Sequence, residues 1–292
     1  MKKIFERLII FFVGVPLVLG VIYFPFFHHL PFNLMVFGVS SFAAYELSLM
    51  FGTNGQTLSR PLLMALAPLL PICEYLNIIF GLDCLTTIAL IATSFIVFTV
   101  EIFTAKEFAM SNARIARSLC VIFYAGFLPS FITRISGIAS EKAANSTFAF
   151  LATFMVLVFI SDSAAWLFGM LFGKNNRGIL LASPNKSAAG FAGAYVGSFV
   201  FALLMTHIVF KNVFATTMLL QKTAILSVVI CSAAIIGDLA ESVFKRSAEV
   251  KDSGNVVLGR GGVLDSVDSI FMAAPFCMPL SPEDNYASVG VR

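Results

Sequence analysis

Charged side chains are scarce in this sequence of 292 residues, where Asp, Glu, Lys and Arg make up 12% and hydrophobic residues 59%. A single Trp stands beside 32 Phe, and the formal net charge is only +3. So small a charge gives no reason to expect nucleic acid as a partner. The composition excludes an ordinary soluble domain and predicts an all-α, polytopic membrane protein, because helices satisfy their own backbone hydrogen bonds where water is missing.

Several other features are missing. The sequence has no CxxC or Cys/His spacing, no GxxxxGK[ST] pattern of a P-loop, no convincing internal repeat and no low-complexity tract. We therefore expect the cysteines to be small buried hydrophobic residues. They lie singly in or beside apolar segments, at Cys73, Cys84, Cys120, Cys231 and Cys277.

Apolar runs predict about nine transmembrane helices, since about 20 residues cross a bilayer. The predicted ranges are 8–24, 32–51, 62–80, 84–103, 118–133, 148–172, 190–210, 222–237 and 263–280. The last range is short and interrupted by Pro275 and Pro279, so eight helices are the alternative. The charged start of the chain is like that of a signal peptide, but no clear cleavage site follows it. We therefore expect a retained first helix.

The basic residues indicate the orientation of these helices. With the N-terminus in the cytoplasm, 14 of the 19 Lys and Arg residues fall on the inner side. This places the loops 173–189 and 238–262 on the cytoplasmic face, where nucleotides are. We expect a multi-pass protein of a bacterial inner membrane. Residues 1–135 would form a scaffold of helices, and residues 136–292 a catalytic transmembrane domain that carries both loops.

The first candidate motif surrounds Asp162, which lies deep inside the apolar run 148–172. An uncompensated carboxylate costs at least about 2.5–3.5 kcal/mol there, so it marks a functional candidate. On a helix, Asp162 and Trp166 share one face with Gly169 and Gly173. The glycines would let another helix approach closely. The alternative is a packing seam in which Asp162 pairs with a hydroxyl or a lysine.

The second candidate precedes the next apolar run. Ser183, Lys186 and Ser187 could hold a phosphate through hydroxyls, an ammonium group and the free N–H groups of a helix N-terminus. The alternative is a helix cap beside a lysine that reaches for the membrane surface.

The densest group of acids and bases begins where the apolar run 222–237 ends. On a helix, Asp238 shares a face with either Glu241 or Ser242. Lys245 follows on the same face one turn further along. Ionisable residues at the edge of an apolar segment are functional candidates, so this face is a candidate site.

Asp265 and Asp268 are i, i+3 neighbours at the mouth of the last apolar segment. Carboxylates from two helices can converge on Mg²⁺, which prefers oxygen ligands and keeps substrate phosphates in its shell. A surface loop with charge pairs is the alternative, but it does not explain four acids beside membrane helices. The segment between the helices holds residues that suit a polyphosphate, namely Lys245, Arg246, Lys251, Gly259, Arg260, Gly261 and Gly262.

Ten residues follow the spacing S-x-x-K-R-x4-K-D and then G-x-G-G-x-x-D-x-x-D. They are Ser242, Lys245, Arg246, Lys251, Asp252, Gly259, Gly261, Gly262, Asp265 and Asp268. In this pattern the chain resembles the phosphatidate cytidylyltransferase (CDP-diglyceride synthetase) family. Asp162 and the segment 183–190 match the family in order as well, so the resemblance covers about 155–275. The N-terminal half matches only as generic spans.

The sequence departs from the family pattern at three places. Arg260 stands where the family has His, and Ser266 where it has Arg. The family's SPKKTWEG run reads SPNKSAAG here, from Ser183 to Gly190. Arg260 can still bind a phosphate, whereas an arginine missing at position 266 removes a planar fork for phosphate recognition. These changes bear on turnover and nucleotide preference more than on the fold.

The resemblance implies transfer of the cytidylyl group of CTP to phosphatidate, which gives CDP-diacylglycerol and pyrophosphate. One anion must attack another, so the reaction needs charge neutralisation more than a strong base. The resemblance also implies Mg²⁺, with a second monovalent or divalent cation left open, and a homodimer in the bilayer.

The resemblance also assigns roles to the motif residues. Asp238 and Asp265 would be the principal metal ligands, and Glu241, Asp252 and Asp268 would be further ligands or would support them. Lys251 and Asp252 would join the two principal ligands in the catalytic group. Asp162, Ser183 and Lys186 would form the far wall of a cavity open to the cytoplasm for CTP and to lipid for phosphatidate. The other substrate-binding residues would be Ser242, Lys245, Arg246, Arg260, Gly261 and Gly262.

Two other classes of function stay open at this point. One is a related enzyme, either a CTP-dependent polyprenol or phytol kinase or a cytidylyltransferase for another lipid phosphate. The other is an ion-coupled carrier that uses its intramembrane acids. Carriers often have repeated halves with broken helices in matching positions, whereas the polar residues here gather in the C-terminal half.

Overall fold

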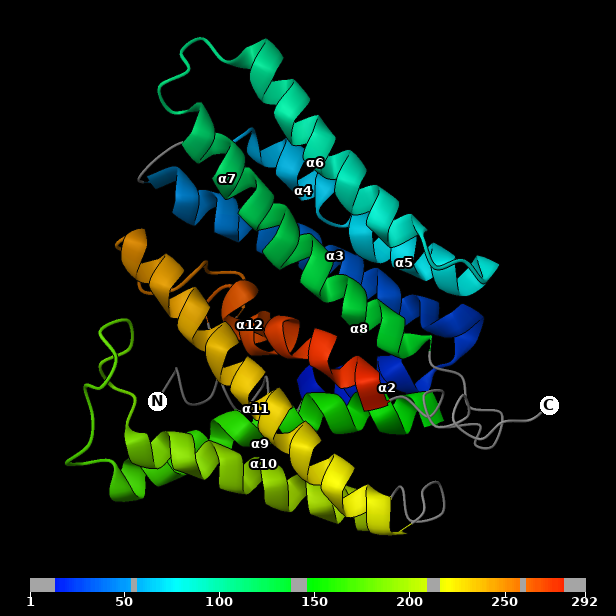
Figure 1. The fold of residues 1–292 in the computed structure, drawn as a ribbon, viewed down its shortest axis with the longest axis vertical. Coiled ribbons are helices and arrows are strands. Elements are labelled where there is room, and N and C mark those ends of the chain that lie inside the picture. Colours follow the sequence, from blue (N-terminus) through cyan, green and yellow to red (C-terminus); the bar gives the residue numbers. More distant parts are fainter. Residues whose placement is uncertain (1–13, 54–56, 138–145, 209–215, 258–260, 281–292) are drawn as a thin grey trace.

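A computed structural model describes residues 14–53, 57–137, 146–208, 216–257 and 261–280 (Figure 1). The elements named within these residues are all helical. They are α2 (Val15–Tyr23), α3 (Phe26–Thr53), α4 (Arg60–Leu66), α5 (Leu69–Phe80), α6 (Leu85–Thr104), α7 (Ser111–Ile122), the π-helix η2 (Phe123–Phe127), α8 (Leu128–Ser136), α9 (Ser146–Phe172), α10 (Ala188–Ile208), α11 (Thr216–Ser247), α12 (Leu264–Ala273) and the 3-10 helix η3 (Ala274–Leu280).

Within the described residues, seven helical segments are long and apolar enough to cross a membrane. They correspond to seven of the nine predicted ranges, so the prediction of a polytopic helical membrane protein is confirmed. The segments are Phe26–Gly52, Arg60–Phe80, Leu85–Thr104, Ser111–Ser136, Thr147–Phe172, Ala188–His207 and Thr223–Ser247.

The first and last predicted ranges take other forms. The range 8–24 begins outside the described residues, and the structure shows only its second part, as α2. The range 263–280 forms the short helix α12 followed by η3. The α-helix gives way at Ala274, directly before Pro275, because a proline has no N–H to donate and restricts the residue before it.

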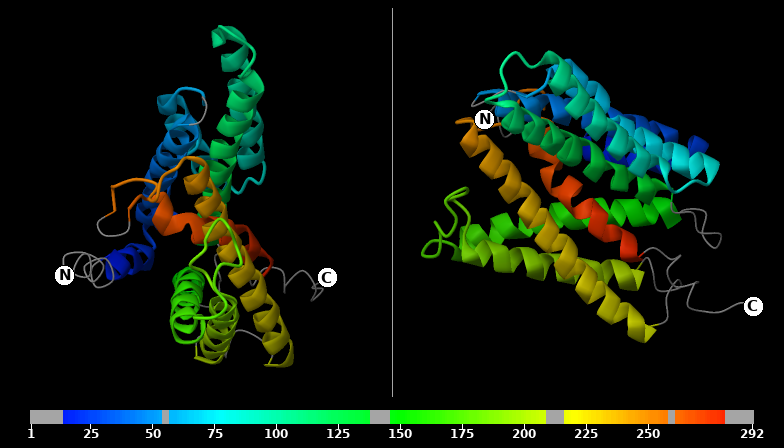
Figure 2. Two further views of the ribbon diagram at one scale, coloured as in Figure 1. Left: turned by 90° about the vertical axis from the view of Figure 1, so that its left-hand side faces the viewer. Right: turned by 45° about the horizontal axis from the view of Figure 1, so that its top comes forward.

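The helices form two groups with α12 between them. Figures 1 and 2 show α3 to α8 on one side and α9 and α10 on the other, while α11 crosses between the groups. Helix α12 packs against α11, α3, α8 and α9. It therefore joins the two halves of the chain at the place where the acidic residues lie.

Glycines allow two of these helix pairs to come close. A Cβ at Gly193 of α10 would lie 2.3 Å from Cβ of Phe168 on α9. At Gly169 of α9, where the sequence predicted that another helix comes close, a Cβ would lie 3.7 Å from Cα of Gly190 on α10. A Cβ at Gly237 of α11 would lie 2.5 Å from the carbonyl oxygen of Asp268 on α12. The absence of a side chain at Gly237 thus brings Asp268 next to the acids of α11.

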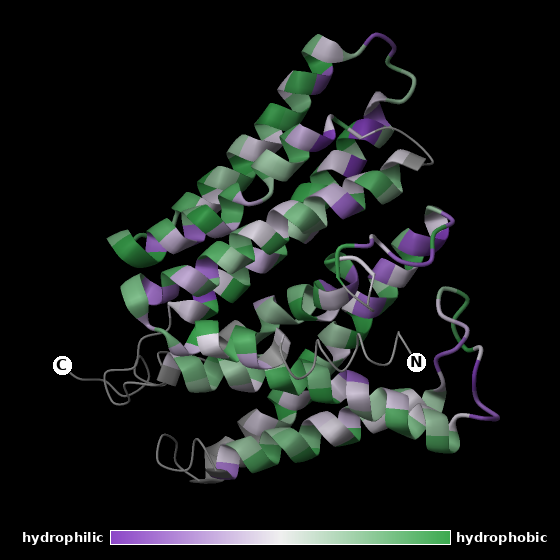
Figure 3. Cartoon of the chain, turned by 180° about the vertical axis from the view of Figure 1, so that it is seen from behind, coloured by the Kyte–Doolittle hydropathy of each residue, from purple (hydrophilic) through white to green (hydrophobic). Residues whose placement is uncertain are grey.

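The polar loops lie at one end of the molecule. Figure 3, coloured by hydropathy, shows the hydrophilic loops after α6, α9 and α11 on the same side. The last two of these are the motif loops that the basic residues assign to one face of the membrane. The two motif loops therefore lie at the same end of the molecule.

We expect a substitution of Gly237 by alanine to disturb the fold much more than the same change at Gly38. The new methyl group at Gly237 would press on backbone of α12, and overpacking of this kind costs about 1–3 kcal/mol. Gly38 on α3 has no atom within 4 Å of such a Cβ, so Gly38→Ala should be neutral or slightly stabilising. Thermal unfolding of both variants in detergent measures the difference. Equal midpoints would show that α12 does not need the close approach.

Candidate active site

Three side chains of α11 line the same cavity, which has a volume of about 530 Å³. They are Asp238, Glu241 and Lys245, spaced at i, i+3 and i+7, so they lie on one face of the helix. Of the two residues that the sequence left as alternatives, Glu241 is the one that faces the cavity. Ser242 is half-buried and lies outside the cavity lining.

Helix α12 adds Asp265 and Asp268 to the cavity wall. One carboxylate oxygen from each of Asp238, Glu241 and Asp268 lies within 4.8 Å of the others. We call these three residues the acid cluster. Glu241 and Asp268 are buried, with 1% and 7% of their surface exposed.

The acid cluster fits a divalent cation. Glu241 Oε1 is buried and has no hydrogen-bond partner within the described part of the chain. Buried carboxylate oxygens normally have a partner, and a hard cation such as Mg²⁺ takes oxygen ligands of this kind. Burial and the negative charge of the nearby Asp162 together raise the pKa of Asp268 to about 7. The hydrogen bond from Ser269 N lowers this pKa but does not outweigh burial. A cation in the cluster would favour the ionised form of all three carboxyl groups.

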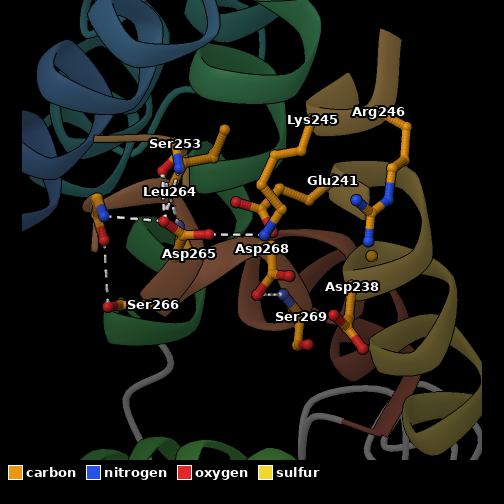
Figure 4. Close-up of polar contacts among 12 residues, drawn as sticks. Asp238, Glu241, Lys245, Arg246, Ser253, Leu264, Asp265, Ser266, Asp268 and Ser269 are labelled. Atoms are coloured by element: carbon orange, nitrogen blue, oxygen red, sulfur yellow. Dashed lines mark hydrogen bonds and ion pairs between the residues drawn. The ribbon is translucent and has the colours of Figure 1, made fainter. Parts of the chain in front are cut away.

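Lys245 lies between the acid cluster and Asp265 (Figure 4). Its Nζ is 2.5 Å from Glu241 Oε2 and 2.6 Å from Asp265 Oδ1. Two carboxylates from different helices therefore share one ammonium group. The positively charged ammonium group of Lys245 therefore lies where the sequence predicted that carboxylates of two helices converge.

The other oxygen of Asp265 is held by the loop before α12. Its Oδ2 accepts hydrogen bonds from Ser253 N at 2.8 Å, Ser253 Oγ at 2.9 Å and Gly262 N at 2.8 Å. Burial alone would raise the pKa of Asp265, but the hydrogen bonds from Lys245 and the backbone amides outweigh it and lower the pKa. Asp265 thus lies beside the acid cluster rather than in it, and its predicted role as a principal metal ligand stays a prediction.

The opposite wall comes from α9 and the loop that follows it. Asp162 and Lys186 both line the cavity, and Lys186 forms an ion pair with Asp238. Burial lowers the pKa of Lys186, although Asp162 and Asp268 oppose this effect. The structure thus places Asp162 and Lys186 in the wall of the cavity that also holds the acids of α11, and their role in substrate binding stays a prediction.

The segment before α10 caps that helix and also contributes to the cavity wall. Ser187 Oγ accepts a hydrogen bond from Gly190 N at 3.0 Å and so caps the start of α10. Ser187 and the neighbouring Lys186 both line the cavity. Ser183 is half-buried and lies outside the cavity lining.

Several predicted residues do not line the cavity. Lys251 and Asp252 are exposed on the loop before α12. Arg246 Nε donates to the carbonyl oxygen of Ala182 at 3.3 Å, which joins the end of α11 to the loop before α10. Gly261 has φ +109°, and a Cβ there would lie 2.7 Å from Asp265 Oδ2, so only glycine fits. Gly262 contributes its backbone N–H to Asp265, and Arg260 lies outside the described residues.

Sequence reasoning missed two further residues. Arg177 lines the cavity from the loop between α9 and α10, and a basic residue in a predicted cytoplasmic loop was a signal that could have found it. Glu46 of α3 is buried and accepts hydrogen bonds from the start of α12. A carboxylate inside the apolar run 32–51 was the corresponding signal.

Comparison with known proteins decides the family. The family described as "Cytidylyltransferase family" matches residues 5–281 of this chain. The chain belongs to that family. The match extends the resemblance seen in the motifs, because it includes the N-terminal half, where the sequence alone offered only generic spans.

Bacterial relatives of this cytidylyltransferase-family chain carry a more specific name. A protein of Staphylococcus saprophyticus named phosphatidate cytidylyltransferase is 35% identical over 187 residues, and those of Staphylococcus aureus and Staphylococcus haemolyticus with the same name are 35% and 33% identical. Each alignment covers 64% of this chain and 66% of the relative, so the chain spans slightly less than two thirds of their length.

Proposed function

We propose that this member of the cytidylyltransferase family transfers the cytidylyl group of CTP to phosphatidate, giving CDP-diacylglycerol and pyrophosphate. One observation carries the proposal. A single cavity holds the acid cluster together with the ammonium groups of Lys186 and Lys245. Facing acids and bases of this kind suit a reaction between two phosphates. The names of the relatives supply the substrates.

The chemistry needs little proton transfer. A phosphate oxygen of phosphatidate forms a bond to the α-phosphorus of CTP, and the bond from that phosphorus to the oxygen bridging to the β-phosphate breaks. The phosphate monoester is already anionic near neutral pH, so no strong general base is required. Lys186 and Lys245 line the cavity and would donate hydrogen bonds to phosphate oxygens, reducing the repulsion between the two anions.

Asp238, Glu241 and Asp268 would hold a divalent cation such as Mg²⁺, and we keep Asp265 as a further ligand beside them. When bound, the cation supplies positive charge to the triphosphate and to the departing pyrophosphate. Lys245 now neutralises Glu241 and Asp265. A divalent cation bound to the carboxylates would neutralise them in place of Lys245. The ammonium group of Lys245 would then be available to a phosphate.

The cavity has two chemically different sides. Trp166 and Met170 line it from α9 and are 68% and 52% exposed on a candidate membrane span, so we assign this side to the acyl chains of phosphatidate. Arg177 and Asn185 line it from the polar loop, so we assign that side to CTP and to the cytoplasm. The membrane would be a bacterial inner membrane. A homodimer stays a prediction of the family resemblance, which size measurement in detergent tests.

Labelled CTP distinguishes this proposal from its rivals. Purified protein in detergent with phosphatidate should place label from α-phosphate-labelled CTP into lipid, and none from γ-phosphate-labelled CTP. Lipid labelled from the γ-phosphate would show a kinase instead. Label from neither position, with phosphatidate present, would overturn the proposal. The same assay with polyprenol or another lipid phosphate would then reveal a related enzyme, and ion flux into vesicles a carrier.

A further inference from the structure

Glu46 connects the N-terminal half of the chain to the candidate active site. It lies on α3, has 1% of its surface exposed and accepts three hydrogen bonds. Its Oε1 accepts from Val263 N at 2.9 Å, and its Oε2 from Leu264 N at 2.8 Å. Oε2 also accepts from Ser253 Oγ at 3.0 Å.

These contacts cap α12 from a distant part of the sequence. The first N–H groups of a helix have no partner within the helix, and a carboxylate near them is favoured by the helix dipole. Val263, the residue before α12, provides no side-chain cap. Glu46 takes that role, so the start of α12 is fixed relative to α3.

Ser253 extends the connection to Asp265. Its Oγ lies 3.0 Å from Glu46 Oε2 and 2.9 Å from Asp265 Oδ2. A serine hydroxyl has one proton, so it can donate fully to only one of the two carboxylates at a time. The hydrogen bonding of Asp265 therefore depends on that of Glu46.

The loop fits closely around the Glu46 carboxylate. A Cβ at Gly254 would lie 2.5 Å from Glu46 Oε1, and a Cβ at Gly262 would lie 2.4 Å from Oε2. Two glycines thus let the backbone wrap the carboxylate. Glu101, a buried acid in the same half of the chain, has a different environment, because it pairs with Arg114.

We propose that Glu46 is a positioning residue for cytidylyl transfer. It anchors the start of α12 and, through Ser253, holds Asp265 in the orientation that the acid cluster requires. The effect of Glu46 on the reaction rests on the proposed function, whereas the anchoring of α12 and Asp265 by Glu46 does not. Partners of this kind that orient the residues around a metal typically change metal affinity or activity about 10- to 100-fold when they are replaced.

Amide hydrogen exchange of the full-length protein tests the geometry without any activity. Glu46→Gln leaves the side chain its shape, but its NH₂ group cannot accept a hydrogen bond from a backbone N–H. We expect faster exchange in the peptide that contains residues 253–264, and unchanged exchange there in the control Glu101→Gln. Unchanged exchange in Glu46→Gln would overturn the proposal, as would an equal increase in both variants.

The functional part is tested by direct Mn²⁺ binding and by the Mg²⁺ dependence of the reaction. We expect Glu46→Gln to weaken Mn²⁺ binding and to raise the Mg²⁺ concentration for half-maximal rate, each about 10-fold or more. The folded fraction of Glu101→Gln should keep wild-type values. If folded Glu46→Gln matches wild type in both, Glu46 is only structural. A wild-type protein that makes no CDP-diacylglycerol contradicts the proposed function, while the Mn²⁺ result still decides the role of Glu46.

A second variant keeps the test decisive if Glu46→Gln does not fold. Ser253→Ala removes the hydroxyl between the two carboxylates and leaves Glu46 its bonds to α12. We expect weaker Mn²⁺ binding in this variant too. Where both variants fold, the double variant should show less than the sum of the two single effects, because both remove the hydrogen bond between Ser253 and Glu46. Wild-type Mn²⁺ binding by Ser253→Ala would overturn the connection to Asp265.

Discussion

Asp265→Asn should reduce formation of CDP-diacylglycerol about 10²- to 10³-fold, the loss seen when one electrostatic group at a reacting centre is removed. The amide keeps the size of the carboxylate and one oxygen for the N–H groups of Ser253 and Gly262. It removes the negative charge that faces Lys245 at 2.6 Å. The protein should therefore remain folded in the membrane. A Mg²⁺-dependent assay with CTP and phosphatidate, together with thermal unfolding, measures both effects.

A matched control is Asp83→Asn, which makes the same chemical change at an exposed acid between α5 and α6, outside the cavity. Its activity should equal that of the wild type. If Asp265→Asn kept full activity, Asp265 would only be a structural residue at the start of α12. If it lost activity only in proportion to a loss of folded protein, the same conclusion would hold.

Lys186→Met should lower kcat/KM for CTP about 10²-fold or more, because one cation at the phosphate site is lost. Lys186 lines the cavity and pairs with Asp238, so its removal also leaves that carboxylate without this partner. The methionine keeps much of the apolar length of the side chain. Steady-state rates at several CTP concentrations measure the effect.

Lys174→Met is the comparison for this change. Lys174 lies in the same loop between α9 and α10, but it is exposed and outside the cavity lining. Its replacement should leave kcat/KM for CTP within about twofold of wild type, since exposed charges contribute little to local interactions. Equal losses in both variants would mean that the loop acts through its overall charge and that Lys186 has no specific role.

The length of the apolar runs made much of the fold predictable, and helical periodicity made part of the site predictable. The apolar ranges from 32–51 to 222–237 have the length of a membrane crossing, and seven spans follow them in the structure. Asp238, Glu241 and Lys245 share a face because their spacing follows the helix turn. Asp162 was predictable as a cavity residue because a carboxylate within an apolar run needs a compensating environment.

Loop residues were less predictable, because a loop has no periodicity that tells which side chains point inward. Lys251 and Asp252 match the family motif in spacing, yet both are exposed outside the cavity lining. Arg246 lies one residue beyond Lys245 and so falls on another face of α11, where it contacts the loop before α10.

Tertiary contacts explain what the sequence could not give. Glu46 lies more than 200 positions before the residues it binds, and no local pattern links them. The membership of the acid cluster likewise depends on the close approach of α11 and α12 at Gly237. For the same reason, the sequence named Asp265 before Asp268 as a principal ligand. The structure places Asp268 in the acid cluster, and the ligand role of Asp265 stays a prediction.

Anomalous scattering from crystals soaked in Mn²⁺ tests most directly whether carboxylates of α11 and α12 hold a divalent cation in the cavity. We predict a strong peak within bonding distance of Asp238, Glu241 and Asp268, and its loss in Asp238→Asn crystals. A map with no peak there, or with a peak elsewhere that Asp238→Asn leaves unchanged, would contradict a metal-assisted reaction at this site.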